Sequence, residues 1–170
     1  MRRVVVRALA TTVVALTMAG LAAPAARADT SDLRLPGGPT SESDARPVSL
    51  DAHIYVPSAT PAPAVILAHG FGGSRNDLDE RATELSDRGF VVLAYSARGF
   101  GTSTGQISMN SPDFEVADAR ALIDFLATRD DVQQDSAGDP PVGVAGGSYG
   151  GALALLTHGY DPRVDAVAAD

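Results

Sequence analysis

Ser148 lies in the segment Gly146–Gly150, whose sequence Gly-Gly-Ser-Tyr-Gly fits the pattern Gly-x-Ser-x-Gly. A short apolar run, Val142 to Ala145, precedes this segment, and the helix-like segment Ala152 to Leu156 follows it. A strand, a sharp turn and a helix form the context in which this pattern exposes a serine hydroxyl above a sheet. Side chains at the two flanking glycines would collide in such a turn, so both must be small. We therefore predict that Ser148 is a nucleophile held in a strained backbone conformation.

A serine nucleophile needs a base, usually a histidine oriented by a carboxylate, and N–H donors for the negative oxygen of its intermediates. The first donor would be the backbone N–H of Tyr149, directly after the nucleophile. The second would be the backbone N–H of Phe71 in the loop His69–Gly73, whose glycines allow a substrate to approach closely. The alternative for this loop is an ordinary glycine-rich turn. His69 precedes the serine, and we assign it to this loop rather than to the base.

Composition excludes several other kinds of site. The chain of 170 residues has no cysteine, and all 13 basic residues are arginines, so thiolate metal sites, P-loops and Schiff-base lysines are excluded. The three histidines lie far apart in the sequence, and we expect no metal and no cofactor. Without its first 28 residues the chain has nine arginines against 21 acidic residues, a net charge of −12. An acidic surface repels phosphate backbones, so we expect no nucleic-acid partner.

Residues 1–28 have the pattern of an export signal. Arg2, Arg3 and Arg7 form a basic start, an apolar stretch follows, and Ala26-Arg27-Ala28 supplies a small-x-small cleavage site. The alternative is an uncleaved membrane anchor. We predict a secreted protein that begins at Asp29 and has no stable membrane association after cleavage.

The remaining chain alternates between predicted strands and helices. Residues 29–47, rich in Pro, Gly, Ser and Asp, are predicted to be a flexible lead-in. The alternation of Val48–Val56 predicts a half-buried antiparallel strand near a sheet edge, with His53 on its polar face. Buried strands are predicted over 64–68, 90–95, 142–145 and 164–169, and helices from a capping box at Ser74 and from Ser111-Pro112.

This order predicts an α/β fold with a mostly parallel sheet and helices on both faces. His69, Arg98 and Ser148 each follow the end of a predicted strand. Since active sites of such sheets lie at the carboxyl ends of the strands, we expect the three residues to converge there.

The segments Arg98–Ser103 (Arg-Gly-x-Gly-x-Ser) and Gly146–Gly151, with the loop His69–Gly73, resemble the α/β-hydrolases. More narrowly, they resemble the Xaa-Pro dipeptidyl-peptidase and cocaine-esterase-like hydrolases, in which the two motifs recur as a pair. Two positions depart from that family: Ser96 stands where relatives often carry Asp, and Phe71 lacks the hydroxyl that a tyrosine gives some oxyanion sites. The resemblance implies a secreted serine hydrolase that acts by acyl transfer on a small peptide, ester or amide.

The order of the triad in this fold is nucleophile, acid, histidine. His158 lies ten residues after Ser148, about 15 Å along a helix, and cannot reach it. Asp161, Asp165 and Asp170 come too early to be the acid. We therefore expect residues 48–170 to be the amino-terminal part of an α/β-hydrolase domain truncated before its last strands. The acid and the histidine would lie beyond Asp170, and residues 29–170 alone would be inactive.

Two other functions remain open. The first is an exported non-catalytic binding protein with a degenerate hydrolase fold. The second, a nucleotide-binding Rossmann domain, is weakly supported, because Thr104 stands where its Gly-x-Gly-x-x-Gly pattern needs glycine and no helix is predicted to begin there.

Overall fold

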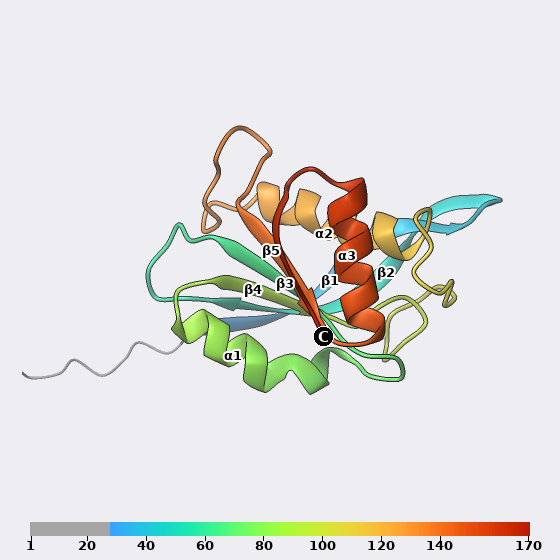
Figure 1. Cartoon of the computed structure of the whole chain (residues 1–170), viewed down its shortest axis with the longest axis horizontal. Coiled ribbons are helices and arrows are strands. Elements are labelled where there is room, and N and C mark those ends of the chain that lie inside the picture. The colour runs from blue at the N-terminus through green and yellow to red at the C-terminus, as the bar shows by residue number, and fades with distance from the viewer. Residues whose placement is uncertain (1–27) are drawn as a thin grey trace, which may run out of the picture.

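The computed structural model describes residues 28–170, in which six strands form one sheet in the order β1-β2-β4-β3-β5-β6 (Figure 1). The predicted export signal lies, apart from Ala28, outside these residues. The elements are strands β1 (Asp29–Ser41), β2 (Asp44–Val56), β3 (Ala64–Ala68), β4 (Val91–Tyr95), β5 (Val142–Gly146) and β6 (Val164–Ala169), the 3-10 helix η1 (Arg75–Leu78), and helices α1 (Asp79–Asp87), α2 (Glu115–Ala127) and α3 (Tyr149–Tyr160).

Strands β4, β3, β5 and β6 are parallel to one another, and β1 and β2 are antiparallel to their neighbours. Ala68, the last residue of β3, pairs with Tyr95 of β4 on one side and Gly146 of β5 on the other. The segments that follow these three strands therefore start at the same edge of the sheet. The predicted mostly parallel sheet is confirmed.

Helices cover both faces of the sheet, as predicted (Figure 1). On one face, α2 and α3 pack against the large core cluster through side chains such as Leu122, Leu126 and Leu153. On the other face, Ala82, Leu78 and Leu85 of η1 and α1 pack against a smaller cluster that includes Leu67 and Val92. Apolar strands such as β4, in which every residue is buried, are explained by this double coverage.

The prediction that residues 29–47 are a flexible lead-in is wrong. They form β1 and the start of β2, which pair antiparallel from Asp29 opposite Val56 to Ser41 opposite Asp44. Pro36 and Pro39 are tolerated because β1 has a neighbour on one side only, and the register shifts at both prolines. Leu33 and Leu35 pack on the core and anchor the strand. The strand 48–56 is antiparallel and near the edge of the sheet, as predicted, with β1 as the edge strand itself.

Two helix starts and the last strand also differ in detail. The capping box at Ser74 forms as predicted, but it opens η1, and α1 begins only at Asp79. Helix α2 begins at Glu115, three residues later than Ser111-Pro112 predicts, and Pro112 lies in the preceding turn. Strand β6 forms as predicted, but only Val164 is fully buried, because among the described residues β6 pairs with β5 alone.

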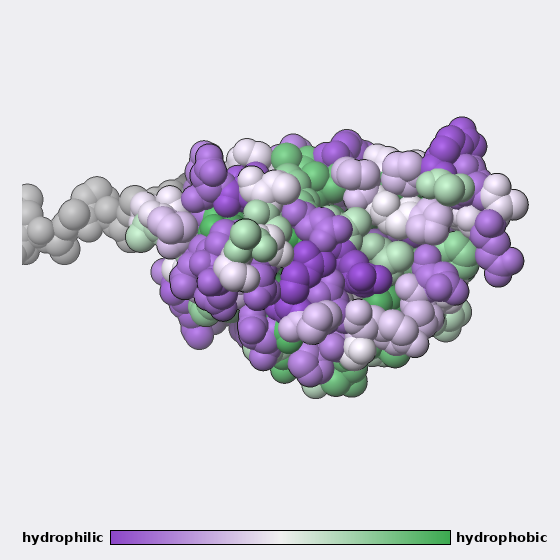
Figure 2. All heavy atoms as spheres, turned by 90° about the horizontal axis from the view of Figure 1, so that it is seen from above, coloured by the Kyte–Doolittle hydropathy of each residue, from purple (hydrophilic) through white to green (hydrophobic). Residues whose placement is uncertain are grey.

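The outer surface matches the acidic composition. On the face shown in Figure 2, hydrophilic residues predominate and apolar residues form separate small patches. None of the helices within residues 28–170 combines the length and hydropathy that crossing a bilayer requires.

Candidate active site

The turn between β5 and α3 has the geometry that the sequence predicts. Ser148 is the residue before the helix, with φ 53° and ψ −114°, a region that non-glycine residues rarely adopt. A Cβ atom on Gly146 would lie 2.5 Å from the carbonyl oxygen of Ala68 and 2.6 Å from the backbone of Gly150. The flanking glycines are therefore required by the close approach of three backbone segments, as predicted.

The backbone of Ser148 is held on both sides while its side chain remains free. Its N–H donates to the carbonyl oxygen of Asp170 at 2.7 Å, and its own carbonyl accepts from the Ala152 N–H at 2.9 Å. Ser148 is exposed, and its hydroxyl makes no hydrogen bond to the helix that it precedes. The turn thus presents an unoccupied hydroxyl on a fixed backbone.

The loop His69–Gly73 lies beside this turn. A Cβ atom on Gly70 would be 3.8 Å from the Gly147 carbonyl oxygen, and the rings of Phe71 and Tyr149 are 5.7 Å apart. In residues 28–170, neither the Phe71 N–H nor the Tyr149 N–H donates to another backbone carbonyl. The two predicted oxyanion donors are therefore on adjacent segments and available, and their role stays a prediction.

His69 is a structural member of this loop. It is 3% exposed, and its Nε2 accepts a hydrogen bond from the Ala97 N–H at 2.9 Å. The ring proton is therefore on Nδ1, which donates to the Gly70 carbonyl oxygen at 2.7 Å. Burial lowers the pKa of His69 below its usual value of 6.5. A neutral imidazole with both nitrogens engaged has no lone pair free to accept a proton from Ser148.

The other two histidines lie elsewhere in the fold. His158, near the far end of α3, interacts through Nδ1 with the Val164 carbonyl oxygen at 2.9 Å. His53 on β2 is 3.3 Å from the Tyr55 hydroxyl, and its ring is 21% exposed rather than fully solvated. The part of the chain that the structure describes therefore brings no histidine to Ser148 as a base.

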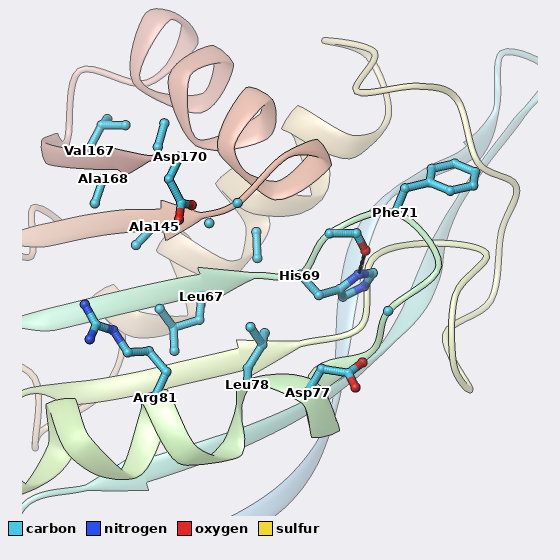
Figure 3. A pocket seen from close by; sticks show the side chains of 16 residues that line it. Leu67, His69, Phe71, Asp77, Leu78, Arg81, Ala145, Val167, Ala168 and Asp170 are labelled. Carbon is cyan, nitrogen blue, oxygen red and sulfur yellow. Dashed lines mark hydrogen bonds between the residues drawn. The ribbon is translucent and has the colours of Figure 1, made fainter.

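A cleft of about 920 Å³ opens beside the turn (Figure 3). Its walls are the His69–Phe71 segment, the Gly146–Gly147 backbone and the end of β6 from Ala168 to Asp170, and Asp77 and Arg81 line its α1 side. In Figure 3 the Asp170 carboxylate points into this space, close to the β5 end. Ser148 itself is not among the lining residues, so the cleft lies beside the serine turn rather than over its hydroxyl.

Arg98 does not join this site, contrary to the predicted convergence. It is fully buried, and its guanidinium binds the Asp118 carboxylate through two hydrogen bonds and the Pro39 carbonyl oxygen through a third. Its face also lies 5.1 Å from the Phe114 ring. Arg98 thus joins β1, α2 and the loop after β4, while the serine and the His69 loop form the site without it.

Three residues next to the site escaped the sequence prediction. Phe100 packs its ring 5.2 Å from Phe71 and 5.7 Å from Tyr149, Asn110 donates to the Tyr149 carbonyl, and Glu115 accepts from the Tyr149 hydroxyl. In the sequence, the one indication of these contacts was an acidic residue, Glu115, next to the apolar face of the predicted helix.

Among residues 28–170, no group of three or more acidic, cysteine or histidine side chains is placed to hold a metal ion.

Comparison with known proteins finds relatives by sequence and by fold. Uncharacterized protein PA2218 of Pseudomonas aeruginosa is 30% identical over 125 residues, which cover 71% of this chain and 32% of that protein. Human monoglyceride lipase is 34% identical over 108 residues, covering 64% of this chain and 34% of the enzyme. The chain thus spans about a third of the length of these curated relatives.

Solved structures have the same architecture. The crystal structure of PA2218 superposes with a TM-score of 0.68 at 25% identity, covering 94% of this chain and 48% of that one. The Pyrococcus furiosus esterase Pf2001 superposes with a TM-score of 0.66 at 20% identity, covering 82% of this chain and 51% of the esterase. The family model of the serine aminopeptidases, S33, matches residues 59–169, which include both the His69 loop and the serine turn. The chain therefore belongs to this family, within the α/β-hydrolase fold.

Proposed function

We propose that the protein is a secreted serine hydrolase that transfers the acyl group of a small ester, amide or peptide to water through Ser148. The observation that carries the proposal is the exposed, unbonded hydroxyl of Ser148 on a strained turn between β5 and α3. Two free backbone N–H groups, of Tyr149 and Phe71, accompany it on adjacent segments. A nucleophile with preorganised donors is the arrangement that acyl transfer requires.

The chemical steps follow from these groups. The Ser148 Oγ attacks the substrate carbonyl carbon while a base removes the hydroxyl proton, and the carbonyl oxygen becomes the oxyanion. The oxyanion receives hydrogen bonds from the Tyr149 and Phe71 N–H groups. As it collapses, the conjugate acid of the base gives its proton to the leaving oxygen or nitrogen, so that a neutral alcohol or amine departs and an acyl-serine remains. Water, activated by the same base, then attacks the acyl carbon, releases the carboxylic acid and restores the hydroxyl.

None of the histidines in residues 28–170 is placed to act as the base. His69 has both nitrogens engaged, and His53 and His158 lie away from the turn. The proposal therefore keeps the sequence prediction that the acid and the histidine lie beyond Asp170. The relatives, which are about three times as long as the matched segment, support this placement.

The substrate class is proposed at the level of small acyl compounds. Membership in the serine aminopeptidase family supports a peptide, and the likeness to monoglyceride lipase supports an ester. The narrower resemblance to Xaa-Pro dipeptidyl-peptidases stays a prediction from the paired motifs. The aromatic cluster of Phe71, Phe100 and Tyr149 beside the turn favours an apolar acyl group.

Labelling with a fluorophosphonate probe tests the nucleophile. The protein expressed from its complete coding sequence should be labelled, and Ser148→Ala should not be. Ser103→Ala is the matched control, because the Ser103 hydroxyl is committed to the Ser96 carbonyl at 2.6 Å and accepts from the Asp51 N–H. A Ser148→Ala protein that is still labelled, or a folded wild type that is not labelled, would refute the proposal and favour a non-catalytic binding protein.

Amino-terminal sequencing of protein from the culture medium tests secretion. Cleavage after Ala28 predicts a first residue of Asp29. Protein held in the membrane with Arg2 still present would contradict this part of the proposal and leave the chemistry unaffected.

A further inference from the structure

Tyr149, the residue that supplies the first oxyanion donor, is held by a side chain from a distant loop. The amide Nδ2 of Asn110 donates to the Tyr149 carbonyl oxygen at 2.9 Å. Asn110 is only 7% exposed, and its other polar atom, Oδ1, is buried without a partner among the described residues. A buried amide with one unpaired atom is costly. The hydrogen bond to Tyr149 is therefore the interaction for which the Asn110 amide is buried here.

A buried carboxylate fixes the loop that carries Asn110. Glu115, the first residue of α2, is 1% exposed and accepts from the Ser108 N–H at 2.5 Å and from the Ser111 N–H at 2.9 Å. The same carboxylate accepts from the Tyr149 hydroxyl at 3.3 Å. Burial, reinforced by Glu115, raises the pKa of Tyr149 above its usual value of 10, so the hydroxyl remains a donor. Glu115 thus ties both ends of the loop 108–111 to the first residue of α3.

The loop conformation shows that this arrangement is imposed. Met109 and Asn110 are consecutive non-glycine residues with φ angles of 55° and 62°. Asparagine tolerates the left-handed region, whereas methionine does not favour it. Met109 is 70% exposed, so packing of its side chain does not stabilise this conformation. The conformation persists because the Glu115 carboxylate holds the loop from both sides. Its result is that the Asn110 amide faces the Tyr149 carbonyl.

We propose that Asn110 and Glu115 are positioning residues that orient Tyr149, and with it the N–H that binds the oxyanion. The inference rests on the proposed function, because it assigns them a role in the acyl transfer at Ser148. Asn110 holds the carbonyl end of Tyr149, Glu115 holds its hydroxyl, and Phe71 and Phe100 pack against its ring. With these three points fixed, Tyr149 cannot rotate its N–H away from the serine.

Asn110→Asp is the sharpest test, because it keeps size and shape and replaces the donating Nδ2 with a carboxylate oxygen that accepts only. Gln134→Glu is the matched control: it makes the same amide-to-carboxylate change on an exposed loop residue. Both are made in the protein expressed from its complete coding sequence. The measurements are kcat and KM on a p-nitrophenyl ester, the affinity for phenylboronic acid, which mimics the tetrahedral intermediate, and the ¹⁵N shift of the Gly150 amide, whose peptide includes the Tyr149 carbonyl.

We expect Asn110→Asp to lower kcat by about 10- to 100-fold, somewhat less than the loss of a whole oxyanion donor, with KM within about twofold. Phenylboronic acid affinity should fall by the same factor, and the Gly150 shift should move. Gln134→Glu should match the wild type in all three measurements. Tyr149→Phe, which removes only the hydroxyl bound to Glu115, should give a smaller loss with the same split between kcat and KM.

Other results would overturn the inference: a wild-type kcat in Asn110→Asp, a kcat loss without a loss of boronic acid affinity, or an unmoved Gly150 resonance. If Asn110→Asp does not fold, as judged by the absence of a cooperative thermal transition, Tyr149→Phe and Glu115→Gln decide by the same criteria. Ser148→Ala, assayed in parallel, separates the two claims. If it retains turnover, the proposed function fails and the inference with it. If turnover requires Ser148 and the Asn110 and Tyr149 variants match the wild type, the inference alone is wrong.

Discussion

Two glycine-rich turns follow parallel strands at the same edge of the sheet, and they serve opposite purposes. The turn after β5 leaves Ser148 exposed, with its hydroxyl free. The segment Arg98–Ser103 after β4 buries Arg98 completely and commits the Ser103 hydroxyl to the Ser96 carbonyl. Both turns contain residues with positive φ, Ser148 in the first and Gly99 and Gly101 in the second.

The difference is in how each turn satisfies its polar groups. In the Arg98 segment each polar side chain has a protein partner, so none of these side chains is left free to bind a ligand. In the other turn the Ser148 backbone is hydrogen-bonded, and its side chain is not. Position at the carboxyl edge of the sheet therefore does not by itself identify which side chain is free to react.

The largest expected contrast between the two turns is in turnover. Ser148→Ala should lower kcat by roughly 10⁴- to 10⁶-fold, as loss of the nucleophile does in serine hydrolases. Ser103→Ala should leave kcat nearly unchanged and reduce stability by about 1–2 kcal/mol, because the Asp51 N–H loses its acceptor. Steady-state ester hydrolysis and urea unfolding of both variants measure the contrast. Comparable kcat losses in the two would contradict it.

Next in size is the effect of opening the buried pair of the Arg98 segment. Arg98→Met should destabilise the fold by about 3–5 kcal/mol, because the Asp118 carboxylate, 1% exposed, would lose its charged partner. Arg88→Met breaks an exposed pair with Glu84 and should change stability by less than about 1 kcal/mol. Urea unfolding monitored by circular dichroism compares them. Equal losses would show that burial does not distinguish the two pairs.

A smaller loss is expected from adding one methyl group at the end of β5. In Gly146→Ala the new Cβ would meet the backbone of Ala68 and Gly150, which cannot move aside, and we expect a cost of about 2–3 kcal/mol. Gly143→Ala, in the same strand, would meet its nearest neighbour at 3.7 Å, an ordinary contact, and should be tolerated within about 0.5 kcal/mol. Thermal unfolding of both variants tests whether the close approach at Gly146 exists in solution.

The smallest expected effect is the pH dependence contributed by His69. Its folded-state pKa is lowered by burial, so below the usual value of 6.5 the unfolded chain binds a proton that the native imidazole does not. Stability should therefore be independent of His69 above pH 6.5 and decrease as the pH falls through 6.5. Urea unfolding from pH 8 to 5.5 should show this decrease in the wild type and a weaker one in His69→Gln. Parallel curves would show that His69 titrates normally in the folded state.

The sequence alone was sufficient to predict the strands and turns that a local residue pattern determines. The apolar runs 64–68, 142–145 and 164–169 predict strands, and Gly-x-Ser-x-Gly between a strand and a helix predicts the turn at Ser148, because the glycines permit the close backbone approach that this turn makes. The His69 loop is located in the same way, by glycines that follow a strand.

Tertiary structure alone decided what each polar group binds. Residues 29–47 have the composition of a loop, and they become β1 because the edge of the sheet supplies hydrogen-bond partners through β2. Arg98 follows a strand as Ser148 does, and its hydrogen bonds to Asp118, 20 residues later, and to the Pro39 carbonyl oxygen remove it from the site. Asn110 and Glu115 reach Tyr149 from 39 and 34 residues away. Sequence spacing carries no information about such contacts, because they are fixed by how α2 and the loop before it pack against α3.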